Sequence, residues 1–119
     1  MTDQVRRRWR DYRTAAGRRL VNEFITKLSL DDQAEVAAAM QDVRENGLVV
    51  ARHLRGDIYE VRATGIQEEF RILFATEGAR SQVLLSLEAF SKKSRKTPPP
   101  KIALAERRLA DWRRRSRKG

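Results

Sequence analysis

The chain has 119 residues, of which 40% are hydrophobic and 35% charged, a balance typical of one folded domain with a heavily charged surface. It contains no cysteine, which excludes a disulfide framework and a thiolate metal site. No apolar run is long enough to span a membrane, and the N-terminal residues lack the apolar stretch of a secretory signal. We therefore expect a single cytoplasmic domain over residues 1–119.

The formal net charge of +10 is distributed unevenly. Residues 1–19 hold seven arginines against two aspartates, and residues 91–119 hold twelve basic against two acidic residues. The body between them is mildly acidic, with seven basic and twelve acidic residues. Basic ends of this kind favour a polyanionic partner, and we expect nucleic acid rather than an anionic membrane. Solubility alone is the simpler alternative.

The first quarter of the chain predicts a strand and a helix. Val5, Trp9 and Tyr12 stand among arginines in residues 4–13. Aromatic and β-branched residues favour a short edge strand there, with a frayed basic arm as the alternative. Apolar residues then follow helical spacing up to residue 28, with a regular start expected near Arg18.

A second helix is expected directly after the first. Asp31 or Asp32 is placed to cap it, Glu35 to complete a capping box, and Gly47 to end it. Two short antiparallel helices would form a hairpin that covers one face of a sheet. Residues 48–55 are apolar and expected to be extended; they include the single histidine, His53, for which a structural role is more common than a catalytic one.

Three apolar runs, at residues 58–62, 69–75 and 82–90, predict three antiparallel strands joined by glycine-bearing turns. Side chains alternate between the faces of a strand, so each run offers one apolar and one polar face. The polar face would carry Glu60, Arg62, Arg71, Glu88 and Phe90. We expect an α+β fold in which an antiparallel sheet of three to four strands packs on the helical hairpin through its apolar face.

The C-terminal part of the chain predicts a third helix. Pro98–Pro100 end the last strand and can open a helix, and apolar residues recur at helical spacing within residues 101–115. Arginines and lysines dominate residues 113–119, which we expect to form a basic tail.

No nucleotide-binding, metalloprotease or hydrolase motif is present, and we expect neither a metal nor another cofactor. What remains is a phosphate-directed site. RNA carries its own nucleophile, the 2′-hydroxyl, so an enzyme must move protons and stabilise charge on the phosphate. Arg62 and Arg71 on adjacent strands could clamp one phosphate, Glu88 could act as a base, and Lys92 and Lys93 could bind phosphate or supply an acid. Cross-strand ion pairs on a solvated face are the competing explanation.

The runs LRGDIYEVR (54–62), FRILF (70–74), FSKKSRKTP (90–98) and IALAERRLAD (102–111) resemble the RelE/ParE superfamily of type II toxins, in particular its HigB-like, phage-derived branch. The resemblance implies a compact α+β toxin fold with two helices on the sheet and a C-terminal helix. It also implies cleavage of mRNA in the ribosomal A site. The implied partner is a small antitoxin, often a helix-turn-helix protein.

Carried over by position, the resemblance supports Arg62 and Arg71 as catalytic arginines, with Glu88 and Lys92 beside them. The residues expected to contact RNA are Arg55, Phe90, Lys93, Arg95 and Lys96, of which several belong to the family's run that ends at Thr97 and Pro98.

Two positions depart from the family pattern. Phe70 stands where many relatives have tyrosine, and Glu88 where many have histidine. The acid/base assignment is therefore open between Glu88 and the arginines and lysines.

Two other functions stay open. A ParE-like inhibitor of DNA gyrase needs no phosphate-clamping face, so alanine at Arg71 would leave its toxicity intact. A non-enzymatic RNA- or ribosome-binding protein would use the basic ends for salt-sensitive affinity and would create no new mRNA 5′ ends.

Overall fold

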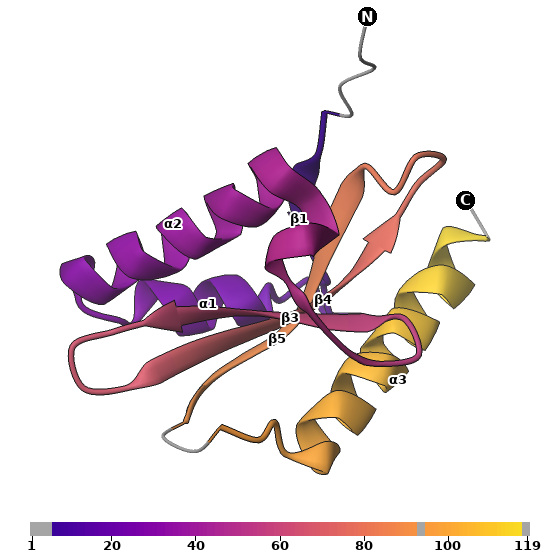
Figure 1. Ribbon diagram of the computed structural model, residues 1–119. Helices are drawn as coiled ribbons and strands as arrows, with labels where there is room; N and C mark the ends of the chain where they lie inside the picture. Colours follow the sequence, from indigo (N-terminus) through magenta and orange to yellow (C-terminus); the bar gives the residue numbers. More distant parts are fainter. Residues whose placement is uncertain (1–5, 93–94, 118–119) are drawn as a thin grey trace, which may run out of the picture.

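The computed structural model of the chain describes residues 6–92 and 95–117, which form a sheet with helices on both of its faces (Figure 1). The helices are α1 (Leu20–Thr26), α2 (Leu30–Asn46) and α3 (Pro99–Ser116), with a short 3₁₀ turn at Gly47–Val50. The strands are β1 (Arg8–Asp11), β2 (Arg52–Arg55), β3 (Ile58–Thr64), β4 (Glu69–Glu77) and β5 (Val83–Lys92). The expected α+β class is confirmed.

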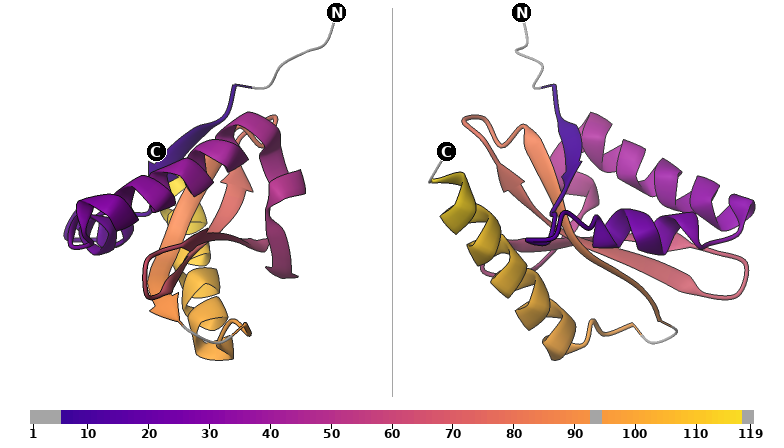
Figure 2. Two further views of the ribbon diagram at one scale, coloured as in Figure 1. Left: turned by 60° about the vertical axis from the view of Figure 1, so that its left-hand side comes forward. Right: turned by 180° about the vertical axis from the view of Figure 1, so that it is seen from behind.

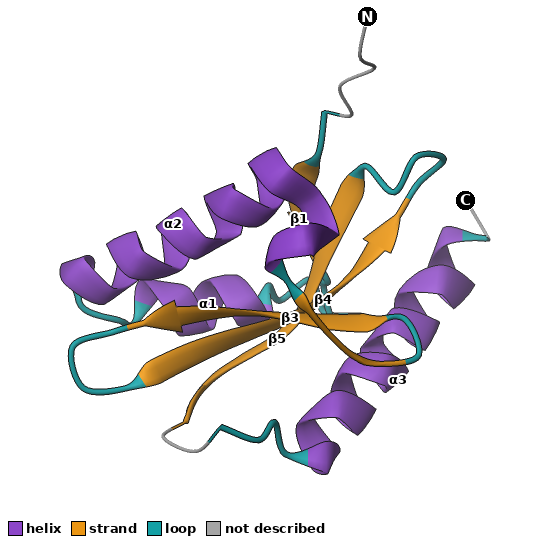
Figure 3. Ribbon diagram, in the orientation of Figure 1, coloured by secondary structure: helices purple, strands orange, loops and turns teal. Residues whose placement is uncertain are grey.

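The sheet differs from the expected antiparallel one of three to four strands. Among the described residues it has five strands in the order β1-β5-β4-β3-β2, and it is mixed because β1 runs parallel to β5. Figure 3 shows the strands in orange and the helices in purple. The edge strand expected in residues 4–13 is present, but its partner lies more than seventy residues along the chain, with Arg8 opposite Val83. Local patterning carries no information on a pairing of that range.

Both faces of the sheet are buried, whereas the sequence predicted burial of one. Helices α1 and α2 cover one face and α3 the other (Figure 2). The first core contains Val36, Val61, Phe70, Ile72 and Phe74, and the second contains Ile58, Leu73, Leu85, Ala105 and Leu109. The expected helical hairpin and C-terminal helix are confirmed, but α3 adds a second core that the alternating pattern did not indicate.

A β-bulge explains part of this difference. The register between β4 and β5 shifts between Leu73, opposite Glu88, and Phe74, opposite Ser86, which leaves Leu87 as the extra residue. An extra residue reverses the alternation of side chains beyond it. Leu87 and Phe90 therefore both belong to the core beneath α3.

The helix ends follow their sequence signals with small displacements. The side chain of Ser29 caps α2 by accepting from the N–H of Asp32 at 3.1 Å, so the predicted caps at Asp31 or Asp32 and the box with Glu35 are wrong. Gly47 ends α2 with a φ of 78°, a left-handed conformation that glycine adopts without strain. Helix α1 begins at Leu20, two residues after the expected start.

Helix α3 runs further than expected and is tied to the sheet near its C-terminal end. Residues 113–116, assigned to a basic tail, are helical. Arg113 pairs with Glu77 of β4 and with Asp57, each at 2.9 Å, and those ion pairs give this part of the helix a fixed place. Within the described part of the chain, no helix is both long and apolar enough to cross a membrane.

Candidate active site

Two arginines converge on one carboxylate at the end of α3 where the helix begins. Arg62 of β3 and Arg71 of β4 stand directly opposite each other in the sheet register. One oxygen of Glu69, Oε1, lies 3.2 Å from the Nη2 atom of Arg71 and 3.5 Å from the Nη1 atom of Arg62. The structure thus brings the two predicted arginines together, with an anion between them.

The pair belongs to a closed loop of contacts that we call the charged ring: Glu60, Arg62, Glu69, Arg71 and Thr97. Nε of Arg62 donates to Glu60 at 2.6 Å, and the Thr97 hydroxyl donates to the other oxygen of Glu60. Nη1 of Arg71 donates to that hydroxyl at 3.4 Å. Two carboxylates balance two guanidinium groups, so the ring carries no net charge.

Burial divides the ring into an inner and an outer half. The side chains of Glu60 and Arg71 are fully buried, whereas those of Arg62 and Glu69 are 27% and 34% exposed. The competing explanation, ion pairs on a solvated face, is therefore wrong for Arg71, which is buried. Its guanidinium is held by Glu69 and by the Thr97 hydroxyl.

A basic groove opens beside the ring. Its volume is about 480 Å³, and it is lined by Arg52, Leu54, Arg95, Lys96, Thr97 and Ile102. Thr97 belongs to both the groove and the charged ring. Nη2 of Arg62 donates to the backbone carbonyl of Arg95 at 2.5 Å, which fixes the rim of the groove against the sheet. The described lining has three cationic side chains and no carboxylate.

Two of the three lysines predicted from the sequence lie near the charged ring and the basic groove. Lys92, at the end of β5, is the register partner of Glu69, so the two side chains lie on the same face of the sheet. Lys96 and Arg95 are exposed at the groove. Lys93 lies outside the described residues.

Glu88 is placed differently from the base that the sequence suggested. Its carboxylate is 2.9 Å from Nζ of Lys101 and 3.2 Å from Nη1 of Arg108, both on α3, and it also accepts from the N–H of Ala89 at 3.1 Å. The side chain is 12% exposed. Held by two cations beneath the helix, Glu88 joins α3 to β5.

Phe90 and Arg55, both expected to contact RNA, differ in exposure: Phe90 is buried, whereas the side chain of Arg55 is 48% exposed. Phe90 is 7% exposed, packs in the core beneath α3 and has Nζ of Lys101 at 5.3 Å from its ring centre. A buried ring offers no face for a base to stack on. Arg55 pairs with Glu106 of α3 at 2.6 Å. His53 contacts the carbonyl of Gly56 through Nε2 at 2.7 Å, in a turn on the surface.

Sequence reasoning missed Glu69, the residue that occupies the centre of the site. A signal for it existed, since Glu69 and Arg71 are two residues apart on one strand and must share a face. Arg52 of the groove carried no such signal, because its place depends on the pairing of β2 with β3. Among the described residues, no three histidine, aspartate or glutamate side chains gather in a way that could hold a metal ion.

Comparison with known proteins agrees with this arrangement. The family described as "Phage derived protein Gp49-like (DUF891)" matches residues 23–110, which include every member of the charged ring. The chain belongs to this Gp49-like family. The resemblance to the HigB-like, phage-derived branch of the RelE/ParE toxins is thereby confirmed. The Gp49-like chain is also 32% identical, over 109 residues, to two proteins named "Probable endoribonuclease HigB1" from Mycobacterium tuberculosis, strains CDC 1551 / Oshkosh and H37Rv. The match covers 89% of this chain and 85% of each relative.

Proposed function

We propose that the protein is the toxin of a type II toxin–antitoxin system and that it cleaves mRNA on the ribosome. The observation that carries the proposal is the convergence of Arg62 and Arg71 on one oxygen of Glu69, beside a groove with three cations. Two guanidinium groups that share one anion form a binding site for a phosphate, because they match its geometry and its charge. The similarity to the probable endoribonucleases HigB1 supports the same class of activity.

The reaction needs no external nucleophile. The 2′-oxygen of one nucleotide attacks the neighbouring phosphorus, the bond from phosphorus to the 5′-oxygen breaks, and the 2′-hydroxyl proton is released as the leaving oxygen gains one. Negative charge builds on the phosphoryl oxygens in between. A preorganised donor aimed at such charge lowers the barrier by roughly 3–4 kcal/mol, and Arg62 is the arginine of the pair that solvent reaches.

In the absence of RNA, the carboxylate of Glu69 occupies this phosphate-binding site. A phosphate that pairs with both arginines takes the place of Glu69, whose Oε1 now pairs with both of them. Lys92, across the strand from Glu69, then provides a further cation for the phosphate, and the groove at Arg95 and Lys96 holds the neighbouring part of the strand.

No side chain is assigned as general base, because Glu88 is neutralised by Lys101 and Arg108. The catalytic contribution of the site is to orient the RNA and to stabilise charge, and the ribosome completes the orientation of the message. The partner proposed for the toxin is a small antitoxin that covers the site in the cytoplasm until the toxin is needed.

The experiment that tests the proposal is a map of mRNA 5′ ends after brief induction of the protein in growing cells. We expect new ends within translated regions for the wild type, and few for Arg62→Gln at equal protein level. Arg107→Gln, an exposed arginine of α3, is the matched control and should cleave like the wild type. Growth arrest without new ends would contradict the proposal; relaxed DNA in those cells would indicate gyrase inhibition, and unrelaxed DNA a non-enzymatic binder.

A further inference from the structure

The outer edge of β1 is open to a partner. Among the described residues, β1 is the end strand of the sheet and has β5 as its one neighbour. The N–H of Arg8 donates to the carbonyl of Gln82 on the β5 side at 2.9 Å. Backbone groups of successive residues in a strand point to opposite edges, so those of Trp9 and Asp11 point away from β5. Within the described residues, no hydrogen bond satisfies these four backbone groups.

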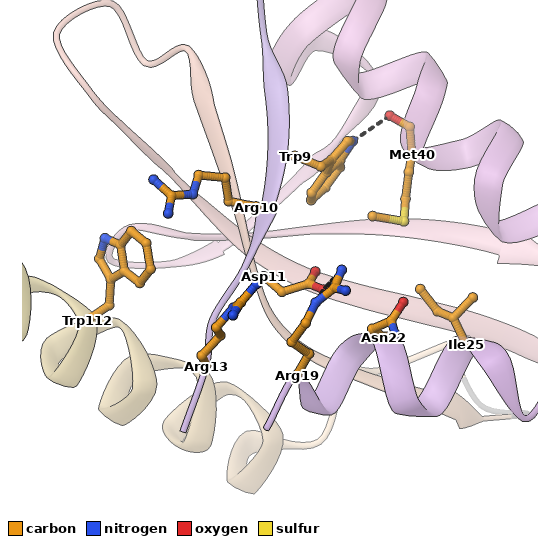
Figure 4. Close-up of a pocket in the computed structure, with 9 residues that line it drawn as sticks. All are labelled: Trp9, Arg10, Asp11, Arg13, Arg19, Asn22, Ile25, Met40 and Trp112. Atoms are coloured by element: carbon orange, nitrogen blue, oxygen red, sulfur yellow. Dashed lines mark hydrogen bonds and ion pairs between the residues drawn. The ribbon is translucent and has the colours of Figure 1, made fainter. Parts of the chain in front are cut away.

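A hollow of about 430 Å³ lies beside this edge, and we call it the β1 hollow (Figure 4). Its lining comes from β1, the segment that follows it, and all three helices: Trp9, Arg10, Asp11, Arg13, Arg19, Asn22, Ile25, Met40 and Trp112. Figure 4 shows Arg10 and Trp112 on one side of β1, and Met40 and Ile25 on the other. The hollow thus has a basic side and an apolar side.

The charge of the β1 hollow is positive and only partly compensated. The carboxylate of Asp11 is held by Arg19 at 2.7 Å and by the hydroxyl of Ser86 at 2.7 Å. Arg10 lies over the Trp112 ring at 5.2 Å from its centre. In the described part of the chain, neither Arg10 nor Arg13 has a carboxylate at ion-pair distance. Two guanidinium groups therefore remain available to an acidic ligand.

We propose that the edge of β1 is a docking site for an extended acidic segment of a protein partner, which adds a strand to the sheet. Arg8 and Arg10 lie two residues apart and point to one face, so carboxylates at every second position of the added strand would lie beside them. The residues between would face Ile25 and Met40 and would be apolar. The proposal rests on the proposed function only in naming the antitoxin as that partner.

Backbone chemistry favours a peptide over RNA at this edge. Phosphates accept hydrogen bonds but donate none, so the phosphate backbone of an RNA strand cannot pair with the carbonyls of Trp9 and Asp11, and its 2′-hydroxyl donors lack the regular spacing of the N–H groups of a strand. A peptide strand supplies both donors and acceptors. A second copy of this chain fits less well, because two β1 edges side by side would bring the rows at Arg8 and Arg10 against each other.

The test uses the full chain and a blocked peptide of alternating glutamate and valine, about six residues long, the usual length of a strand. A peptide with the same residues in two blocks is the control for composition, and a single-stranded oligouridylate is the control for charge. The readout is amide hydrogen exchange at Trp9 and Asp11, measured by NMR. We expect the alternating peptide alone to slow exchange at both amides.

Matched variants locate the contact. Arg10→Glu should lower the affinity of the protein for the alternating peptide about tenfold, equivalent to about 1.4 kcal/mol. Arg107→Glu on α3 should leave that affinity unchanged. Equal binding of both peptides, absence of protection at Trp9 and Asp11, or protection by oligouridylate would each overturn the proposal. RNA cleavage enters none of these measurements, so failure of the docking site and failure of the nuclease proposal are distinguishable.

Discussion

The two faces of the sheet are both buried, but they differ in what they bury. Beneath α1 and α2 the core consists of aliphatic and aromatic side chains such as Val61, Ile72 and Phe74. Beneath α3, an apolar half around Leu73 and Leu109 adjoins a half that contains the described buried charged side chains, Glu60, Arg71 and Glu88. Apolar burial stabilises the fold by itself, whereas a buried charge is tolerated only with its partners in place. The charged half is therefore where a function is to be sought.

Removing Arg71 should cause the largest loss of stability and of activity. It should show most clearly how the charged half beneath α3 differs from the apolar core beneath α1 and α2. Arg71→Ala removes a fully buried guanidinium together with its bonds to Glu69 and Thr97, and we expect it to lower the free energy of unfolding by about 3–5 kcal/mol. Ile72→Ala, its neighbour on the opposite face, should cost about 2–5 kcal/mol through a cavity. Urea unfolding measures both.

Activity should separate those two variants. Cleavage per folded molecule should persist in Ile72→Ala and vanish in Arg71→Ala. A loss for Arg71→Ala below about 1 kcal/mol, the value of a surface ion pair, would mean that the ring is not a buried network in solution.

Arg62→Gln should break function with a smaller effect on the fold. Its side chain is 27% exposed, so we expect about 1–2 kcal/mol of destabilisation from the lost hydrogen bonds to Glu60 and to the Arg95 carbonyl. The rate of RNA cleavage should fall on the order of 100-fold, because a donor to the phosphoryl oxygens is lost. Single-turnover cleavage of ribosome-bound message measures it. A rate within about twofold of Arg107→Gln would exclude Arg62 from the reaction.

The basic groove should make RNA binding depend on the salt concentration. Lys96→Ala removes one cation from the rim, so the slope of log affinity against log salt should become shallower by about 0.7 for single-stranded RNA. Fluorescence anisotropy with a labelled oligonucleotide measures the slope. Lys27, an exposed lysine after α1, provides the control, and Lys27→Ala should leave the slope unchanged. If Lys96→Ala also leaves the slope unchanged, RNA does not bind at the basic groove.

The smallest expected effect is a pH dependence at the other end of α3. The hydroxyl of Tyr12 donates to Asp111 at 2.6 Å, and this bond, with Arg115 and Arg114 nearby, lowers the pKa of Asp111 below its usual 3.8. A carboxyl group with a lowered folded pKa stabilises the fold above its unfolded pKa, and that contribution disappears as pH falls through the folded value.

The thermal midpoints of wild type and Asp111→Asn should therefore differ by a constant amount above about pH 5 and approach each other below 3.8. Asp31→Asn, at an exposed position of α2, controls for the change in net charge. A difference between wild type and Asp111→Asn that does not narrow in acid would argue against the hydrogen bond.

The sequence predicted the elements better than their relations. Helical spacing located α1, α2 and α3, and alternation placed Arg62 and Arg71 on one face, because those patterns are local. The pairing of β1 with β5 and the bulge at Leu87 depend on contacts far apart in the chain, so local patterns carried no trace of them. The burial of Arg71 could not be predicted for the same reason, since its buried hydrogen-bond partner Thr97 lies 26 residues away in the sequence.

The account depends on Glu69 occupying the place where a phosphate of RNA binds. The most direct test is the affinity of Glu69→Gln for a single-stranded RNA oligonucleotide, with Glu68→Gln, its exposed neighbour, as the control of equal charge and shape. Removal of the competing charge should tighten binding roughly tenfold in Glu69→Gln and leave Glu68→Gln like the wild type. Binding by Glu69→Gln that is unchanged or weaker would contradict the account.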